Sequence, residues 1–332
     1  MKKNELSIAS DGSPLPGGPI VTTGNLLHFL ELESLRAPYR ILDAPDSPLL
    51  VPLSFAARMR KRDWFDPLLL QILPRGEELA GRKGFTVDPV HDAAAAIAPC
   101  LLKKYSGRAL LLAGDRCAMT CRYCFRRRRG APLKQSFDAI EAALLHIGRD
   151  ASLREVILSG GDPLCLVPEK LERIARLLAD IPHCSTVRIH TRLPVADPDR
   201  VDAHLATIAF LSTVRTCIVV IHANHEAELG GGVPAALLRL RSTGCLLLNQ
   251  SVLLRHINDC EDRLAKLSCA LLDSGVMPYY LHQLDRVEGA WHFETGVRRG
   301  RELMAGLRRL LPGYAVPRYV REIAGEPAKT PL

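Results

Sequence analysis

The chain has 332 residues, with 44 basic and 36 acidic side chains and a formal net charge of +8 at pH 7. Its hydrophobic content of 47% and charged content of 24% exclude a disordered chain, a collagen-like chain and a small disulfide scaffold. No apolar run approaches the roughly 18 residues of a membrane span, and no apolar segment follows the N-terminal lysines, so neither a transmembrane helix nor a signal peptide is expected. We therefore expect a cytoplasmic protein whose cysteines are reduced.

The N-terminal third is irregular and comparatively rich in proline. Helix-like patterns occur over residues 26–37 and 54–73. We interpret residues 1–104 as a helical N-terminal extension.

The middle of the chain alternates strand-like and helix-like segments. Apolar strands are predicted at six places, which are 109–113, 155–160, 186–191, 216–223, 245–252 and 277–284. Amphipathic helices are predicted between them at 136–147, 168–181, 197–211, 233–244 and 261–275. Such alternation indicates a parallel sheet covered by helices. Since eight units close a TIM barrel, six predict a partial (β/α)6 TIM-like barrel over residues 105–290. A doubly wound sheet is the alternative.

The last segment, residues 291–332, contains a helical pattern at 295–311, a strand-like stretch at 319–323 and a tail with glycine and proline. We treat it as a separate C-terminal segment.

Three of the ten cysteines form a C-x3-C-x2-C motif at Cys117, Cys121 and Cys124. The other seven are scattered, and we interpret them as buried small hydrophobic residues. The motif follows the first predicted barrel strand, at the end where such folds place their active sites. A zinc site usually has four ligands. Three thiolates are also one short of a closed four-iron cluster, so that one iron would stay open to bind another molecule.

The basic run at residues 126–129 directly follows the cysteine motif. Together with a histidine as fourth ligand, it gives an alternative of another class, a zinc-stabilised nucleic-acid-binding protein. Aromatic residues make up only 5% of the chain, whereas binding of single strands favours aromatic stacking. We therefore rank catalysis above binding of nucleic acid.

The segment CAMTCRYCFRR resembles the radical S-adenosylmethionine (SAM) enzymes, and among them the lysine 2,3-aminomutase family. LSGGDPL, VRIHTRLP, LNQSVLLR, MPYYLHQLD and REIAGEPAKTPL match that family in the same order, and the resemblance covers roughly residues 50–332. The sequences CRYCFRR, SGGDPL and GEPAKTPL are most similar to the branch that makes (R)-β-lysine for modification of translation elongation factor P.

This resemblance implies a [4Fe–4S] cluster held by Cys117, Cys121 and Cys124. The open iron would chelate SAM, and an electron from the cluster would cleave SAM to a 5′-deoxyadenosyl radical. The residues that the resemblance places beside SAM are Gly160, Gly161, Asp162, His222 and Gln250.

The resemblance also implies pyridoxal 5′-phosphate (PLP) as a second cofactor, held as a Schiff base by Lys329. Without the resemblance, a lysine so near the C-terminus would be read as a solvated charge. Tyr105 and Arg108 match family positions near PLP.

The same resemblance assigns the residues that select the substrate, L-lysine. Arg126 would clamp the α-carboxylate, as bidentate arginine–carboxylate pairing allows. Asp285 and Glu322 would bind the ε-ammonium group, and Glu322 stands where the family usually has aspartate.

The implied function is an isomerase that converts lysine into β-lysine, with (R)-β-lysine as the expected product. The expected partners are an electron donor such as a flavodoxin or ferredoxin, elongation factor P with its β-lysine ligase, and a second copy of the chain in a homo-oligomer. A metabolic lysine 2,3-aminomutase, which makes β-lysine for catabolism or as an osmolyte, is the alternative within the family.

Overall fold

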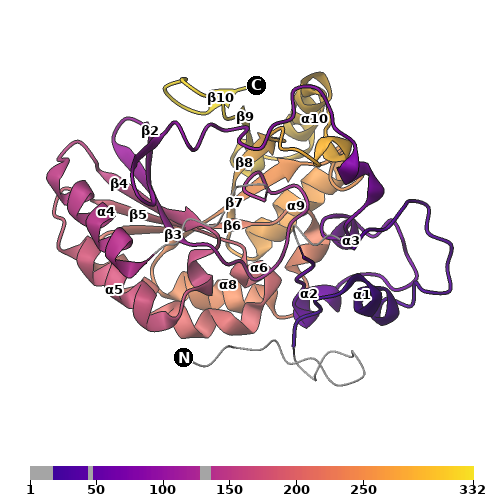
Figure 1. Cartoon of the computed structure of the whole chain (residues 1–332), viewed down its shortest axis with the longest axis horizontal. Coiled ribbons are helices and arrows are strands. Elements are labelled where there is room, and N and C mark those ends of the chain that lie inside the picture. Colours follow the sequence, from indigo (N-terminus) through magenta and orange to yellow (C-terminus); the bar gives the residue numbers. More distant parts are fainter. Residues whose placement is uncertain (1–17, 44–47, 128–135) are drawn as a thin grey trace.

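The computed structural model describes residues 18–43, 48–127 and 136–332. Within them, one sheet of ten strands runs in chain order from β1 to β10 (Figure 1). Six consecutive strands are parallel, namely β3 (Arg108–Gly114), β4 (Glu155–Gly160), β5 (Thr186–Thr191), β6 (Thr216–His222), β7 (Leu246–Leu253) and β8 (Met277–Gln283).

Four further strands extend this sheet at its two ends. On one side, β1 (Ala96–Ala98) and β2 (Leu101–Tyr105) form an antiparallel hairpin that pairs with β3. On the other side, β9 (Arg318–Arg321) is parallel to β8, and β10 (Thr330–Pro331) is antiparallel to β9. Among the described strands, β1 and β10 do not pair with each other. The curved sheet is therefore open, and the predicted partial barrel is confirmed.

The sequential strand order also excludes the doubly wound alternative. A doubly wound sheet reverses its strand order at a switch point, whereas here each parallel strand lies beside the next one along the chain. All six predicted barrel strands are present at nearly the predicted residues.

Helices cover the outer face of the sheet (Figure 1). The long ones are α4 (Phe137–Arg149), α5 (Pro168–Ala179), α7 (Leu205–Val214), α8 (Val233–Ser242), α9 (Glu261–Asp273) and α10 (Val297–Leu310). The predicted helix over 197–211 is instead a 3-10 segment, η3 (Pro198–His204), that leads into α7. Within the described ranges, no helix is long and apolar enough to cross a membrane.

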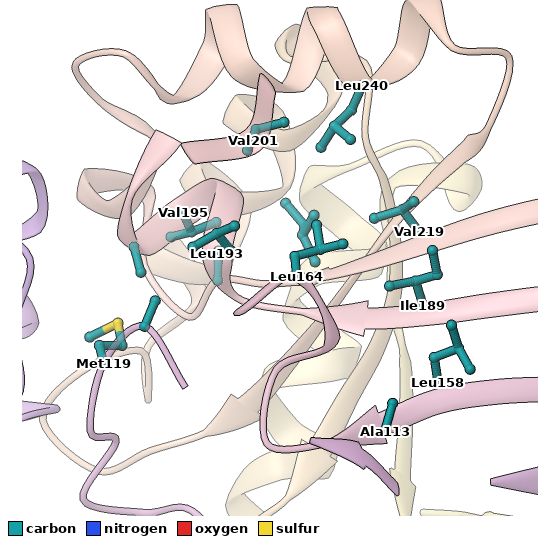
Figure 2. Close-up of a cluster of buried hydrophobic side chains, with 14 of the residues drawn as sticks. Ala113, Met119, Leu158, Leu164, Ile189, Leu193, Val195, Val201, Val219 and Leu240 are labelled. Carbon is teal, nitrogen blue, oxygen red and sulfur yellow. The ribbon is translucent and has the colours of Figure 1, made fainter. Parts of the chain in front are cut away.

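Alternate side chains of each barrel strand pack against these helices. Leu158 of β4, Ile189 of β5 and Val219 of β6 point outward into one continuous core, together with Leu240 of α8 (Figure 2). The intervening residues of the same strands face the interior of the barrel, because side chains alternate along a strand. The polar residues of the candidate site come from this inner set and from the loops after the strands.

Short helices connect the strands and form part of the N-terminal segment. They are α1 (Thr23–Phe29), α2 (Leu53–Ala56), α3 (Pro67–Leu70), α6 (Leu193–Ala196), η1 (Gly76–Leu79), η2 (Pro163–Cys165), η4 (Glu226–Leu229), η5 (Trp291–Phe293) and η6 (Gly313–Ala315).

The prediction of a helix over 54–73 is wrong, since only α2 and α3 form there. Asp66 precedes Pro67, and proline disfavours a helical backbone conformation at the residue before it. The Asp66 carboxylate caps α3 instead, accepting from the backbone N–H groups of Leu68 and Leu69 at 2.9 Å. Side chains of this segment share the main core with the barrel. The division of the chain at residues 104 and 290 stays a prediction.

Candidate functional site

The three clustered cysteines lie on the loop that follows β3. Ala118 and Met119, between the first two cysteines, are buried in the main core. Met119 belongs to the same core cluster as Leu193 and Val195 of α6 (Figure 2). Apolar anchoring therefore fixes the loop, in which Cys117 is exposed and Cys121 and Cys124 are partly buried.

Hydrogen bonds fasten the same loop to the N-terminal segment. The backbone N–H of Arg122 donates to the carbonyl of Gln71 at 2.9 Å. The buried Arg122 side chain pairs with Glu78, which also accepts from Arg127 at 2.9 Å. The loop is thus held from two sides, in the way that a cluster-binding loop must be preorganised.

In the described part of the chain, no group of three Cys, His, Asp or Glu side chains is arranged to hold one metal ion. Zinc needs its ligands around a single ion, whereas the thiolates of a four-iron cluster bind separate irons. Burial and the neighbouring thiols raise the pKa of Cys124, so that a bound cluster would displace protons from the loop.

The other seven cysteines only partly match their prediction. Cys100, Cys184, Cys217 and Cys245 are buried as expected. The prediction is wrong for three others, since Cys269 on α9 is exposed and Cys165 and Cys260 are partly exposed.

Gly160 and Gly161 pack against the backbone that leads into the cysteine loop. Gly160 has a φ of +112°, and a Cβ there would lie 2.4 Å from the carbonyl oxygen of Gly114. A Cβ on Gly161 would lie 2.3 Å from the carbonyl oxygen of Arg116. Since no other residue fits this space, both glycines are required by the chain's own packing. Their predicted contact with SAM stays a prediction.

The carboxylate of Asp162 is fully occupied by internal hydrogen bonds. One oxygen accepts from Leu164 N at 3.0 Å and Thr191 Oγ1 at 2.7 Å. The other accepts from Arg192 N at 2.7 Å and Leu193 N at 2.9 Å. A carboxylate has about four acceptor sites. Asp162 therefore connects η2 to α6, and its backbone N–H also donates within the chain, to the carbonyl of Arg116 at 2.7 Å. Its contact with SAM stays a prediction.

His222 and Gln250 are neighbours across β6 and β7 and both face the barrel interior. His222 Nε2 lies 2.9 Å from the hydroxyl of Tyr123, a residue of the cysteine loop, and the two rings stack at 5.8 Å. Burial, with a smaller effect of Arg192, lowers the pKa of His222 to about 3, so the imidazole is neutral. The Gln250 amide has no hydrogen-bond partner among the described residues and is available to a ligand.

A row of alternating charges crosses the other side of the interior. Arg126 Nε donates to Asp92 at 3.2 Å, and Lys104 Nζ contacts Asp92 at 2.6 Å. Lys104 also pairs with Glu322 at 2.5 Å, and Lys329 pairs with the same carboxylate at 2.8 Å. The structure thus brings together the predicted carboxylate clamp, one predicted acid and the predicted PLP lysine. Sequence reasoning missed Asp92 and Lys104, because nothing in the pattern marks isolated charges in the N-terminal segment.

The two predicted acids differ in their electrostatics. Burial acts to raise the pKa of Glu322, but Lys329 and Lys104 outweigh it and hold this pKa at about 2. Burial raises the pKa of Asp285 to about 6, against the opposing effect of Lys329. Asp285 forms no ion pair with any described residue. It is therefore the acid that is ready to accept a cationic group, whereas Glu322 is already shared by two lysines.

Tyr105 and Arg108 are paired between β2 and β3, with the guanidinium of Arg108 5.3 Å from the centre of the Tyr105 ring. The buried Tyr105 hydroxyl has no partner among the described residues. Beside it lies a depression of about 210 Å³, lined among others by Lys104 and by residues 322–326. The Tyr105 hydroxyl and the Lys104 ammonium line the depression, and the Arg108 guanidinium lies against the Tyr105 ring; such donors fit a phosphate-bearing cofactor. Of the basic run at 126–129, the last two residues lie outside the described part of the chain.

The comparisons with known proteins show the family of the chain. The model of the Radical SAM superfamily matches residues 111–215. The L-lysine 2,3-aminomutase of Escherichia coli (strain K12) is 44% identical over 285 residues, which cover 86% of this chain and 83% of that protein. The chain belongs to the lysine 2,3-aminomutase family of radical SAM enzymes.

Two more relatives show how far the family match extends. The L-lysine 2,3-aminomutase of Buchnera aphidicola subsp. Baizongia pistaciae is 41% identical over 315 residues, covering 93% of this chain and 92% of that protein. That of Bacillus subtilis (strain 168) is 35% identical and covers 86% of this chain, but only 60% of the longer relative. The resemblance of the motifs to this family is confirmed. Membership makes the protein an isomerase that uses a [4Fe–4S] cluster, SAM and PLP.

Proposed function

We propose that this protein converts L-lysine into β-lysine by moving the amino group from C2 to C3. The observation that carries this proposal is the common interior shared by the cysteine loop and the charged row from Arg126 to Lys329. A radical source and a site for a zwitterionic amino acid with a second ammonium group then lie in one barrel.

Each cofactor has fitting residues in this chain. The three thiols of the cysteine loop would hold the cluster, and Lys329, with the donors of Tyr105 and Arg108, would hold PLP. When bound, the cluster with SAM supplies the radical that takes hydrogen from C3, and PLP carries the migrating nitrogen. The protein's part is to fix both cofactors and the substrate in one geometry and to exclude water.

Substrate selection would depend on the charges of the barrel interior. Arg126 is half-buried and keeps guanidinium N–H groups beyond those bonded to Asp92 and Ser159, so it can donate to a carboxylate. Asp285 lies near Lys329 and is free to accept an ammonium group. If Lys329 carries PLP, it no longer pairs with Glu322, and this carboxylate then gains capacity for the substrate ammonium. Loading of PLP would therefore prepare the second acid for lysine.

We further propose that the product is (R)-β-lysine and that a separate ligase attaches it to elongation factor P in the cytoplasm. The motifs CRYCFRR, SGGDPL and GEPAKTPL support this branch of the family. A flavodoxin or ferredoxin would deliver the electron. A β-lysine used in catabolism or as an osmolyte is the competing proposal, and the product's chirality and acceptor distinguish the two.

The test is an anaerobic reaction of the reconstituted protein with SAM, PLP, reductant and L-lysine, followed by chiral chromatography. We expect (R)-β-lysine, and none in the control without SAM. Norleucine, which lacks the ε-ammonium group, should react far more slowly. A protein that carries a full cluster and bound PLP but forms no β-lysine would contradict the proposal.

A further inference from the structure

A buried arginine contacts the central cysteine of the loop. Arg192 directly follows β5, and its Nη1 lies 2.6 Å from Cys121 Sγ. The same nitrogen lies 2.6 Å from the hydroxyl of Tyr123, two residues further along the loop. Arg192 is only 8% exposed. A guanidinium group with so little access to water acts at short range on the sulfur that it contacts.

The rest of this guanidinium group is fixed by other segments. Nη2 donates to Glu228 of η4 at 2.7 Å and to Gln71 of the N-terminal segment at 2.9 Å. Glu228 is fully buried and also accepts from Asn224 N at 2.8 Å and from Gln71 Nε2 at 3.0 Å. Residues from two other parts of the chain therefore hold Arg192 in the orientation that places Nη1 on Cys121.

We infer that Arg192 is a positioning residue that hydrogen-bonds a cluster-ligating sulfur and raises the reduction potential of the cluster. This inference rests on the proposed cluster site of the cysteine loop. On one-electron reduction, taken from a low-potential donor, the cluster gains negative charge, part of which lies on its sulfur ligands. An N–H donor and a positive charge at such a sulfur stabilise the reduced form more than the oxidised form. The neighbouring Glu228 reduces this effect without removing it, because it lies on the other side of the guanidinium group, bonded to Nη2.

A second buried arginine provides a matched control. Arg58 donates to the backbone carbonyls of Glu228 and Val195 and so lies beside the same residue, Glu228, as Arg192. It forms no hydrogen bond with any described cysteine. If Arg192 only stabilises this region of the fold, its substitution should affect the reduction potential of the cluster no more than substitution of Arg58 does. If Arg192 acts on the cluster, only its own substitution should shift this potential.

The experiment compares reconstituted wild type, Arg192→Gln and Arg58→Gln by redox titration, with the reduced cluster followed by electron paramagnetic resonance. At a fixed solution potential, we expect the ratio of reduced to oxidised cluster to fall about tenfold in Arg192→Gln, which corresponds to about 59 mV for a one-electron couple. The cluster of Arg58→Gln should have the wild-type reduction potential. The reduction potential of Arg192→Lys should also be lower than that of wild type, because an ammonium group lacks the two separate nitrogens through which the guanidinium group contacts Cys121 and Glu228.

Iron content and urea unfolding of the apo-proteins accompany the titration. If Arg192→Gln does not fold, Arg192→Lys decides the question. Variants of Arg192 that bind a full cluster and titrate at the wild-type potential would overturn the inference, as would an equal shift in Arg58→Gln. A wild type that binds no four-iron cluster would instead contradict the proposed function, so the two failures are distinguishable.

Discussion

Replacement of Glu322 by glutamine tests the charged row in the barrel interior. The carboxylate pairs with Lys104 at 2.5 Å and with Lys329 at 2.8 Å, and its side chain is 16% exposed. Glutamine keeps the shape but removes the charge. Lys104 then retains Asp92 as a partner, whereas Lys329 loses the carboxylate that it contacts.

The pKa of Glu322 sets the size of the effect. The two lysines, acting against burial, hold this pKa at about 2, compared with an ordinary value of 4.5. At about 1.4 kcal/mol per pKa unit, the ionised carboxylate stabilises the fold by roughly 3 kcal/mol. Because the folded-state pKa lies below the unfolded-state value, this contribution is complete above about pH 4.5 and is lost as the pH falls towards 2. Asp285 can take up part of the freed lysine charge, so we expect a loss of roughly 2–3 kcal/mol at pH 7.

Urea unfolding of the cofactor-free protein measures this loss. Glu326→Gln is the matched control, because Glu326 lies on the same tail, is exposed and forms no ion pair with any described residue. The difference between wild type and Glu322→Gln should persist at pH 5 and should shrink below pH 4. A loss under about 0.5 kcal/mol, the range of ordinary surface substitutions, would refute the assigned network.

Three further variants test the site residues, each with a different measurement. Cys121→Ala should lose most of its iron and all SAM cleavage. The control Cys217→Ala, a buried residue of β6, should keep both. Equal iron content in the two variants would argue against the three cysteines as cluster ligands. Lys329→Ala should lose borohydride-trappable PLP but keep the iron–sulfur chromophore, and trapped PLP in this variant would point to another lysine. Asp285→Asn should reduce kcat/KM for lysine about a hundredfold or more, since an unpaired buried charge costs several kcal/mol; an unchanged preference for lysine over norleucine would refute its role.

The barrel could be predicted because its signals are local. Each strand is an apolar run and each covering helix has a 3.6-residue period, so six βα units are visible without any contact information. The N-terminal segment gave no such signal. Its side chains pack against one another and against the barrel without a regular period, and at residues 54–73 the apolar residues imitate a helix that Pro67 interrupts.

The site could be predicted only where a motif marks it. The cysteine spacing and the lysine near the C-terminus are visible in the sequence, and the family resemblance gives them roles. Asp92, Lys104 and Arg192 are isolated charges without a pattern, and their importance arises only when the fold buries them against other charges. Asp162 shows the opposite case. The motif predicts that it contacts SAM, but in the structure its carboxylate holds α6 and η2.

The N-terminal segment is therefore part of the candidate site and not only a cover for the barrel. Glu78 fixes the cysteine loop through Arg122, and Gln71 holds Arg192 against Cys121. On the opposite side of the interior, Asp92 bridges the predicted carboxylate clamp and Lys104. All of these contacts bind residues before β3 to groups that would hold the cluster, the substrate or PLP. The sheet stays open, because among the described strands β1 and β10 do not pair with each other. The N-terminal segment contributes charged side chains to the interior, which suits the charged molecules proposed to bind there.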